Sequence, residues 1–403
     1  MYRKFSANNI FTGHAMLPEG NVLITDETGV ITEIIALKDA GDNIEFFNGI
    51  LSPGFINAHC HLELSHLKGL IPEKTGLVEF VFKVITERHF AEDQILAAIE
   101  TAENEMLQNG IVAVGDICNN ALTIPQKKKQ RLQYHNFIEV SGFVPALAQA
   151  RFDRSVTILE EYQSATKAND QYSIFNTQRS TLSPHAPYSV SPQLFELINN
   201  ASTNNIITIH NQETIAEEEF IKNKTGDFLK LYEKLGINID FFEATSKSSL
   251  QSWLPYLNND QSIILVHNVT TTAEDIAFTK IGNRKSEIKN WFCLCPNANL
   301  YITDSLPDVN MLIQQQCNIV LGTDSLASNH QLGMLEEIKT LHNNFSQLKL
   351  ETMLQWATIN GAKALQMDHQ LGSFEKGKQP GVVLIESVEN LQVEKNTSSK
   401  RIL

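Results

Sequence analysis

Two histidines separated by one residue, His59 and His61, follow a short apolar run that begins after Pro53. On an extended strand, residues i and i+2 point to the same side, so both imidazoles can reach one metal ion. A lone His-x-His pair is a weak signal, because two histidines often lie close together by chance. The position of this pair at the end of a strand-like segment strengthens its interpretation as a pair of metal ligands.

Two further residues of ligand type stand at the ends of later apolar runs. His210 lies in NIITIHN, and Asp324 ends NIVLGTD. Three imidazoles and one carboxylate suit Zn²⁺ and leave a position for water, although Fe²⁺ or Mn²⁺ fit the same donors. Such an ion lowers the pKa of its water towards about 7 and provides a hydroxide nucleophile at neutral pH. The sequence therefore predicts a divalent metal, with Zn²⁺ as the first choice, on His59, His61, His210 and Asp324.

Proton transfer in such a site needs further residues, and two stand at suitable places. Glu213 follows His210 by three residues in HNQE, close enough to carry protons between water and a leaving group. His267, in LVHN, is placed to hydrogen-bond the water or a developing oxyanion. Glu213 also begins the acidic segment ETIAEEEF, where it would serve equally well to cap a helix. The four predicted ligands together with Glu213 and His267 indicate a catalytic site more strongly than any one of these residues does.

Eight short apolar runs that alternate with helix-like segments must position these residues. Amphipathic stretches such as residues 91–110 separate most of the runs, with apolar positions at helical spacing before a glycine. This alternation predicts a (β/α)8 barrel, and a doubly wound open sheet is the competitor. In a barrel the carboxyl ends of the strands open onto one face, where active sites of this architecture lie. The runs are 54–59, 110–117, 135–140, 179–185, 205–211, 262–268, 292–297 and 318–324.

The two ends of the chain carry further strand-like runs. Residues 21–25 and 29–35 predict a hairpin, which needs a partner sheet, and residues 371–394 offer similar material. The ends are therefore expected to pair into one small β-sandwich domain. The predicted division is residues 1–50 and 369–403 for the sandwich and 51–368 for the barrel.

Two other features concern surfaces. His267 follows Glu213 by 54 positions, and this stretch is long for one strand–helix unit and contains two helical pieces, 226–236 and 249–257, that could cover the pocket. The basic run Lys127–Lys129 is interpreted as a solvated surface of a helix or loop.

Composition excludes several classes of function. Lys plus Arg number 32 against 46 Asp plus Glu, a net charge of −14, which argues against nucleic acid or an anionic membrane as the main partner. The sequence contains no apolar run of 18 residues, so no membrane-spanning helix is predicted. Five irregularly spaced cysteines make no disulfide framework, so we expect a soluble cytoplasmic protein, with a homodimer as one expectation for its assembly.

Several motifs resemble those of a known family. LSPGFINAHCHLE resembles the first-strand motif of the amidohydrolase superfamily, and LGTDS resembles its eighth-strand motif. SPHAPYSVS, HNQE, LVHN and CPNANL are similar, in chain order, to segments of its nucleoside and purine deaminase-like branch, which includes adenosylhomocysteine deaminases and chlorohydrolases. GSFEKGKQPGVVLIE resembles the closing segment, although Pro380-Gly381 replaces a common Ala-Asp pair. The resemblance covers nearly the whole chain.

The resemblance implies a (β/α)8 barrel with an appended β-sandwich from both termini. It also implies one metal on the four ligands named above, because the carboxylated lysine of binuclear relatives has no counterpart in SPHAP. Glu213 would be the proton shuttle and His267 would orient the water. Asp324 would act both as a ligand and as a base on the water.

Substrate contacts follow only from the resemblance. His185 matches a position that faces the substrate base in similar deaminases, and Glu79 and Arg88 lie in a segment resembling the one that binds the ribose or tail. Glu79 and Arg88 also read as ordinary surface charges of a helix. Glu63 and His66, just beyond the metal motif, are candidates for supporting the ligands.

The leading hypothesis is a metal-dependent hydrolytic deaminase of an amino-substituted N-heterocycle that releases ammonia. An adenine nucleoside resembling aminodeoxyfutalosine or adenosylhomocysteine is the preferred small-molecule substrate. The alternatives are hydrolysis of another C–N or C–Cl bond, as in guanine, chlorinated triazines or a cyclic amide such as an imidazolone. A catalytically silent scaffold is a third alternative, but such a protein would have lost ligands that this chain keeps.

Overall fold

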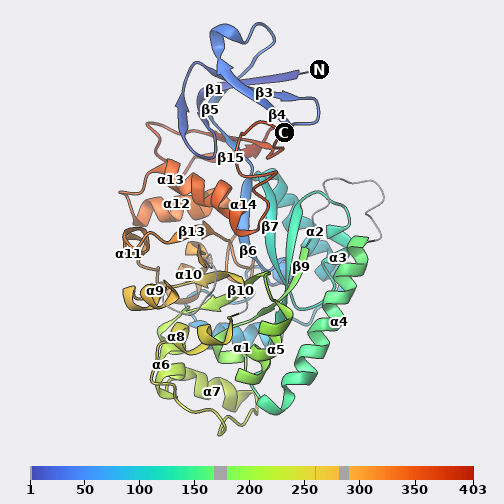
Figure 1. Ribbon diagram of the computed structural model, residues 1–403, viewed down its shortest axis with the longest axis vertical. Coiled ribbons are helices and arrows are strands. Elements are labelled where there is room, and N and C mark those ends of the chain that lie inside the picture. The colour runs from blue at the N-terminus through green and yellow to red at the C-terminus, as the bar shows by residue number, and fades with distance from the viewer. Residues whose placement is uncertain (1, 168–178, 259, 281–289) are drawn as a thin grey trace.

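Eight parallel strands, arranged as two four-stranded sheets, form the centre of the larger part of the protein (Figure 1). The computed structural model describes residues 2–167, 179–258, 260–280 and 290–403. Most strand residues are buried, as expected for parallel strands covered on both faces. One sheet contains β6 (Phe55–Cys60), β7 (Ile111–Cys118), β8 (Gln133–Val140) and β9 (Arg179–Pro184), and the other contains β10 (Ile206–Asn211), β11 (Ser262–His267), β12 (Asn290–Leu294) and β13 (Asn318–Leu321).

The two sheets meet at two seams, and both seams contain residues of ligand type. Between β9 and β10, the amide of His210 donates a hydrogen bond to the carbonyl of His185 at 2.9 Å. Between β13 and β6, the amides of Thr323 and Asp324 donate to the carbonyl of His59 at 3.0 and 3.1 Å. Regular ladders within each sheet and a few bonds at each seam thus build the predicted (β/α)8 barrel.

Helices follow the strands and cover the outside of both sheets (Figure 1). In α2, for example, Ile95, Ile99, Ala102 and Met106 recur at helical spacing and are buried in the main core. Among the described residues, no helix is both long and apolar enough to cross a membrane. The helices are α1 (Leu77–Glu87), α2 (Glu92–Gln108), α3 (Ile124–Lys127), α4 (Ala148–Lys167), α5 (Pro192–Ala201), α6 (Ile215–Asn223), α7 (Asp227–Lys234), α8 (Ser249–Trp253), α9 (Ala273–Lys280), α10 (Pro296–Thr303), α11 (Val309–Gln314), α12 (Met334–Asn344), α13 (Leu350–Gln355) and α14 (Gly361–Ala364).

Both ends of the chain contribute to one small mixed sheet of seven strands, at the end of the molecule where the termini lie (Figure 1). The predicted hairpin is present as β3 and β4, and the C-terminal β14 pairs antiparallel with β5. Phe5, Leu23, Leu51 and Leu384 form part of its apolar core. The domain boundaries at 50/51 and 368/369 stay predictions. The strands are β1 (Tyr2–Phe11), β2 (Met16–Pro18), β3 (Asn21–Asp26), β4 (Ile31–Ala36), β5 (Glu45–Pro53), β14 (Val382–Glu386) and β15 (Ser398–Arg401).

The interpretation of the basic run as a solvated surface is wrong for Lys127. Its side chain is 2% exposed, and its Nζ donates to Asp116 Oδ2 at 2.5 Å and to Asn136 Oδ1 at 2.7 Å. The ammonium also lies over the rings of Tyr134 and Tyr162. Asp116 Oδ1 in turn accepts the amide of Leu62, the residue that follows the second histidine of the metal motif, so this buried ion pair helps to fix the end of β6.

Replacing Lys127 with methionine should therefore destabilise the fold. The substitution leaves the Asp116 carboxylate buried without its charged partner, a change that costs about 3–5 kcal/mol. The free energy of unfolding from urea titration tests this expectation. Lys128→Met, at the exposed neighbouring position, is the matched control and should change stability by less than about 0.5 kcal/mol. Equal stabilities of the two variants would contradict a structural role for the buried pair.

Candidate active site

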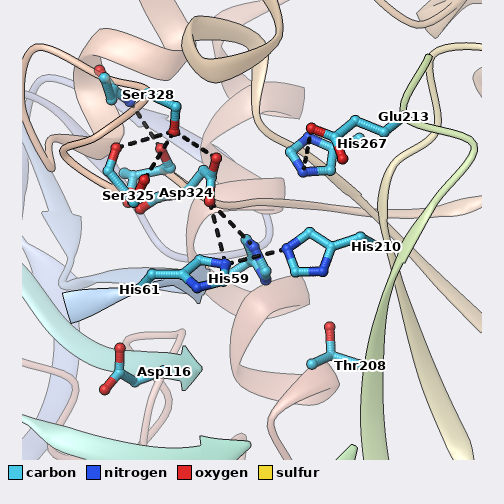
Figure 2. Close-up of polar contacts among 12 residues, drawn as sticks. His59, His61, Asp116, Thr208, His210, Glu213, His267, Asp324, Ser325 and Ser328 are labelled. Carbon is cyan, nitrogen blue, oxygen red and sulfur yellow. Dashed lines mark hydrogen bonds and ion pairs between the residues drawn. The ribbon is translucent and has the colours of Figure 1, made fainter. Parts of the chain in front are cut away.

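Three imidazoles and one carboxylate converge where the two sheets meet (Figure 2). The ligand atoms of His59, His61, His210 and Asp324 all lie within 4.8 Å of one another. His61 Nε2 is 3.2 Å from His210 Nε2, and Asp324 Oδ1 is 3.6 and 3.4 Å from the Nε2 atoms of His59 and His61. The structure thus brings together the four ligands predicted from the sequence.

The local backbone explains why these side chains meet. Along β10, Ile207 and Ile209 pack into the main core, so the strand's alternation turns Thr208 and His210 to the opposite face. At the other seam β13 must approach β6 closely. A Cβ at Gly322 would lie 2.8 Å from the Cβ of His59, so only glycine permits this approach.

Protonation states at the centre suit metal binding. Burial lowers the pKa of His59, His61 and His210, which keeps the imidazoles neutral and their lone pairs available. His210 Nδ1 lies 2.8 Å from the carbonyl oxygen of His185, so Nδ1 carries the proton and Nε2 faces the other ligands. Neither ring nitrogen of His59 has a hydrogen-bond partner among the described residues. A buried imidazole without a partner costs free energy that a bound metal ion would recover, so the donor set fits a divalent metal.

Asp324 is held in its ionised form. Burial alone would raise its pKa, but the neighbouring His61 and His267 and a hydrogen bond from Ser328 lower the pKa below its ordinary value. Ser328 Oγ donates to Oδ2 at 2.6 Å, which leaves Oδ1 facing the imidazoles (Figure 2). The backbone of Asp324 has a φ of 57°, a left-handed conformation that is rare for residues other than glycine. Such strain is common at functional sites.

Glu213 and His267 lie together beside the ligand cluster, with Oε1 of the glutamate 3.6 Å from Nε2 of the histidine (Figure 2). Burial, the charge of Asp324 and the charge of Glu217 raise the pKa of Glu213 well above its ordinary value. Glu213 therefore keeps its proton to higher pH than an ordinary carboxyl group does. In the described part of the chain no hydrogen bond or ion pair joins Glu213 to the four ligand side chains, which separates proton transfer from metal binding.

His267 reaches this position through a strained backbone. The alternation along β11 would place it on the same face as Ile263 and Leu265, which pack into the main core. Its φ of 75° breaks the alternation, and its ring centroid lies 5.6 Å from that of His210. Burial lowers the pKa of His267 to about 3, so the ring is neutral. Asn299 Nδ2 lies 3.2 Å from Nδ1 and, by donating to it, places the ring proton on Nε2.

His185, the first of the predicted substrate contacts, lies beside the metal ligands. Its ring centroid is 4.9 Å from that of His210, and its side chain remains 21% exposed, so it can contact a molecule in the site. Burial lowers its pKa to about 4, and Nδ1 is 2.6 Å from Ser189 Oγ. A substrate would therefore meet a neutral imidazole.

The other two predicted substrate contacts pair with protein groups instead. Glu79 on α1 binds Lys234 of α7 at 3.0 Å, and both side chains are partly exposed. Arg88 donates to the buried Glu63 at 2.9 Å, and its carbonyl oxygen lies 3.1 Å from His66 Nε2. No hydrogen bond or ion pair joins Glu63 or His66 to a side chain of the ligand cluster in the described residues, so a role in supporting the ligands stays a prediction.

Glu139 belongs to the site, but no role for it was predicted from the sequence. It is the penultimate residue of β8, its side chain is 9% exposed, and its Oε1 lies 4.0 Å from His185 Nε2 and 3.9 Å from His210 Nδ1. Asn119 Nδ2 donates to its other oxygen at 2.7 Å. These residues do not make a second metal centre, because His210 Nδ1 is already engaged by the His185 carbonyl. The signal that could have identified Glu139 in the sequence is an acidic residue near the end of a predicted barrel strand.

The barrel and its cluster of three imidazoles and one carboxylate define a protein with a candidate site for a divalent metal, and comparisons with known proteins give the family. A model of the amidohydrolase family matches residues 50–401, and the chain belongs to this family. It is thus an enzyme of the type that hydrolyses carbon–nitrogen bonds, as predicted from the sequence motifs.

Sequence identity to individual relatives is low. Adenosine deaminase from Helicobacter pylori is 26% identical over 86% of this chain and 81% of its own length. A 5-methylthioadenosine/S-adenosylhomocysteine deaminase from Teredinibacter turnerae is 29% identical over 84% of this chain and 72% of its own. The fold is similar to that of Helicobacter pylori aminofutalosine deaminase, solved in complex with methylthio-coformycin, with a TM-score of 0.78, 22% identity and 100% coverage of both chains.

Proposed function

We propose that this protein is a hydrolytic deaminase of an adenine nucleoside that carries a substituent at the 5′ position. The observation that carries the proposal is the pairing of a metal-type cluster with Glu213, a buried carboxyl group of raised pKa beside it. Hydrolysis of an amino-substituted ring needs both an activated water and an acid that protonates the ring. The names of the sequence relatives, which are deaminases of adenosine and of 5′-modified adenosines, support the substrate class.

Each residue then has a defined task. A divalent ion held by the three histidines and Asp324 would lower the pKa of a water molecule and supply the nucleophile. Asp324 Oδ1 accepts a proton from the attacking water, and the neutral His267 orients it through Nε2. Glu213 delivers its proton to the ring nitrogen next to the amino-bearing carbon. The water oxygen bonds to the amino-bearing carbon. The amino group then takes the proton held by Asp324, its bond to the carbon breaks and ammonia leaves, while the new hydroxyl returns its proton to Glu213 and becomes the ring carbonyl.

We propose Zn²⁺ as the metal, because three imidazoles and one carboxylate match its preferred ligands. The five cysteines are all free thiols, which supports our proposal of a cytoplasmic location. The homodimer stays a prediction.

The direct test is ammonia release by zinc-loaded protein across 5′-substituted adenosines, free adenine, guanine, pterins and aminotriazines. We expect turnover of the 5′-substituted adenosines and a higher kcat/KM for them than for free adenine. Ammonia release from guanine, pterins or aminotriazines in place of the nucleosides would refute the proposed substrate class.

A further inference from the structure

The turn that carries Glu213 is held from outside the metal centre by a second glutamate. Glu217, in the first turn of α6, is fully buried. Its Oε1 accepts the amide of Gln212 at 2.9 Å, and its Oε2 accepts the amide of Glu213 at 3.0 Å. One carboxylate therefore fixes two successive peptide groups of the turn.

This arrangement departs from ordinary helix capping. Thr214 is the N-cap of α6 and its side chain accepts the amide of Glu217, as in a capping box. In that motif the glutamate returns a hydrogen bond to the N-cap amide itself. Here Glu217 reaches past Thr214 to Gln212 and Glu213. The carboxylate thus binds the turn formed by Gln212 and Glu213, called the catalytic turn below, and does not cap the end of the helix.

The turn needs such support because its backbone is strained. Gln212 has a φ of 49°, a left-handed conformation that costs free energy in a residue with a Cβ. Its side chain is also fixed, because Nε2 donates to Glu218 Oε1 at 2.8 Å and to Asp275 Oδ2 at 3.0 Å. A turn held at this many points keeps the Glu213 side chain in one place beside His267.

The long segment between Glu213 and His267 supplies the other half of this support. Ser249, the first residue of α8, donates its hydroxyl to Glu217 Oε1 at 2.5 Å and its amide to Glu218 Oε2 at 3.0 Å. The N-cap residue Ser248 donates to Asp275 Oδ1 at 2.5 Å. Helix α8 therefore binds the same carboxylates that hold the catalytic turn.

We propose that Glu217, oriented by Ser249 of the long segment, is the positioning residue for the proton-transferring Glu213. The segment then has a catalytic task besides packing over the barrel: it fixes Glu217, and Glu217 fixes the turn. This inference rests on the proposed role of Glu213. A displacement of about 1 Å of a group that acts in the transition state can lower a rate about 100-fold, so the effect should appear in kcat.

The test compares Glu217→Gln with Glu219→Gln in zinc-loaded protein. In the first variant an amide NH₂ replaces one carboxylate oxygen and faces a backbone N–H, so one of the two peptide groups loses its acceptor. We expect kcat to fall about 10–100-fold with KM within threefold of wild type and one metal per chain retained. Glu219, an exposed carboxylate of the same helix, is the matched control and should leave kcat unchanged.

A double-mutant cycle with Ser249→Ala tests the link to the long segment. Ser249→Ala should lower kcat by itself and have little further effect in the Glu217→Gln background, because both act through one contact. Amide hydrogen exchange of the peptide covering residues 211–214 should accelerate in both single variants. Additive effects on kcat, or a loss of kcat that only parallels loss of metal, would overturn the proposal, as would wild-type kcat and exchange in Glu217→Gln.

Hydrogen exchange also separates this inference from the proposed function. A wild-type protein that releases no ammonia from any nucleoside would refute the deaminase proposal. Unchanged exchange of the turn in Glu217→Gln would refute the positioning role whatever the substrate is. Should Glu217→Gln fail to fold, Ser249→Ala alone still decides, since wild-type kcat and exchange in that variant would refute the role of the segment.

Discussion

Replacing Glu213 with glutamine is expected to lower kcat for nucleoside deamination about 10²–10⁴-fold, the range of a general acid's contribution. Glutamine has nearly the same shape but cannot give up a proton to the ring. Because Glu213 does not belong to the metal-type cluster, the variant should still bind one metal per chain. Steady-state kinetics with metal analysis of the same samples provide the measurement. A variant with wild-type kcat would show that another group protonates the ring.

The pH profile gives an independent check on the same residue. Burial, Asp324 and Glu217 raise the pKa of Glu213, so its acid form persists to higher pH than that of an ordinary carboxyl group and is lost as pH rises through that pKa. Neighbouring histidines and Ser328 lower the pKa of Asp324, so its base form is lost only when pH falls to acidic values. The profile of kcat should therefore be bell-shaped, and Glu213→Gln should lack the alkaline limb. An unchanged alkaline limb in the variant would assign it to a different group.

The four residues of the metal-type cluster could be recognised in the sequence because they stand at the ends of predicted strands. In a barrel every carboxyl end opens onto one face, so His59, His61, His210 and Asp324 had to approach one another once eight alternating runs were recognised. The alternation of strands and helices predicted a barrel, and the metal-ligand residue types at the strand ends indicated a shared site on one face of it. Residues that act through backbone contacts left no such pattern.

Lys127 and Glu217 illustrate what the sequence could not show. Lys127 stands in a run of three lysines, and only Asp116 of β7 and Asn136 of β8 explain why the first of the three is buried. Glu217 lies in an acidic segment in which several positions appear equivalent. Its role depends on Ser249, 32 residues further along the chain, and no periodicity relates the two.

Glu79 and Arg88 show a different limit. Their segment forms a helix near the barrel mouth. The partners of a long charged side chain, however, depend on which groups lie nearby in the folded protein, and the sequence does not show this. Lys234 of the long segment and the buried Glu63 supply those partners. Roles of Glu79 and Arg88 in binding the ribose or tail therefore stay predictions, since a substrate would have to compete with ion pairs that already exist.

Removing the metal, or its carboxylate ligand, should abolish turnover altogether. Chelated protein is expected to lose ammonia release and to regain it with one equivalent of Zn²⁺ per chain. The cluster of His59, His61, His210 and Asp324 supplies only donor atoms, so without an ion no Lewis acid lowers the pKa of the water. Loss of a ligand that binds only the folded state should also lower stability, by about 2.7 kcal/mol when free zinc is at 100 times its Kd.

Asp324→Asn separates the two tasks of that residue. The amide keeps the shape and one oxygen, but it carries no charge and cannot accept the proton of the attacking water. We expect weaker zinc binding and a loss of kcat that saturating zinc does not restore, because refilling the site returns the ion without the base. Ser325→Ala is the matched control, since that hydroxyl lies 3.1 Å from Ser328 Oγ and is not part of the ligand cluster, and it should retain both metal and activity. Recovery of wild-type kcat by Asp324→Asn at saturating zinc would reduce Asp324 to a ligand alone and move the base function to another residue.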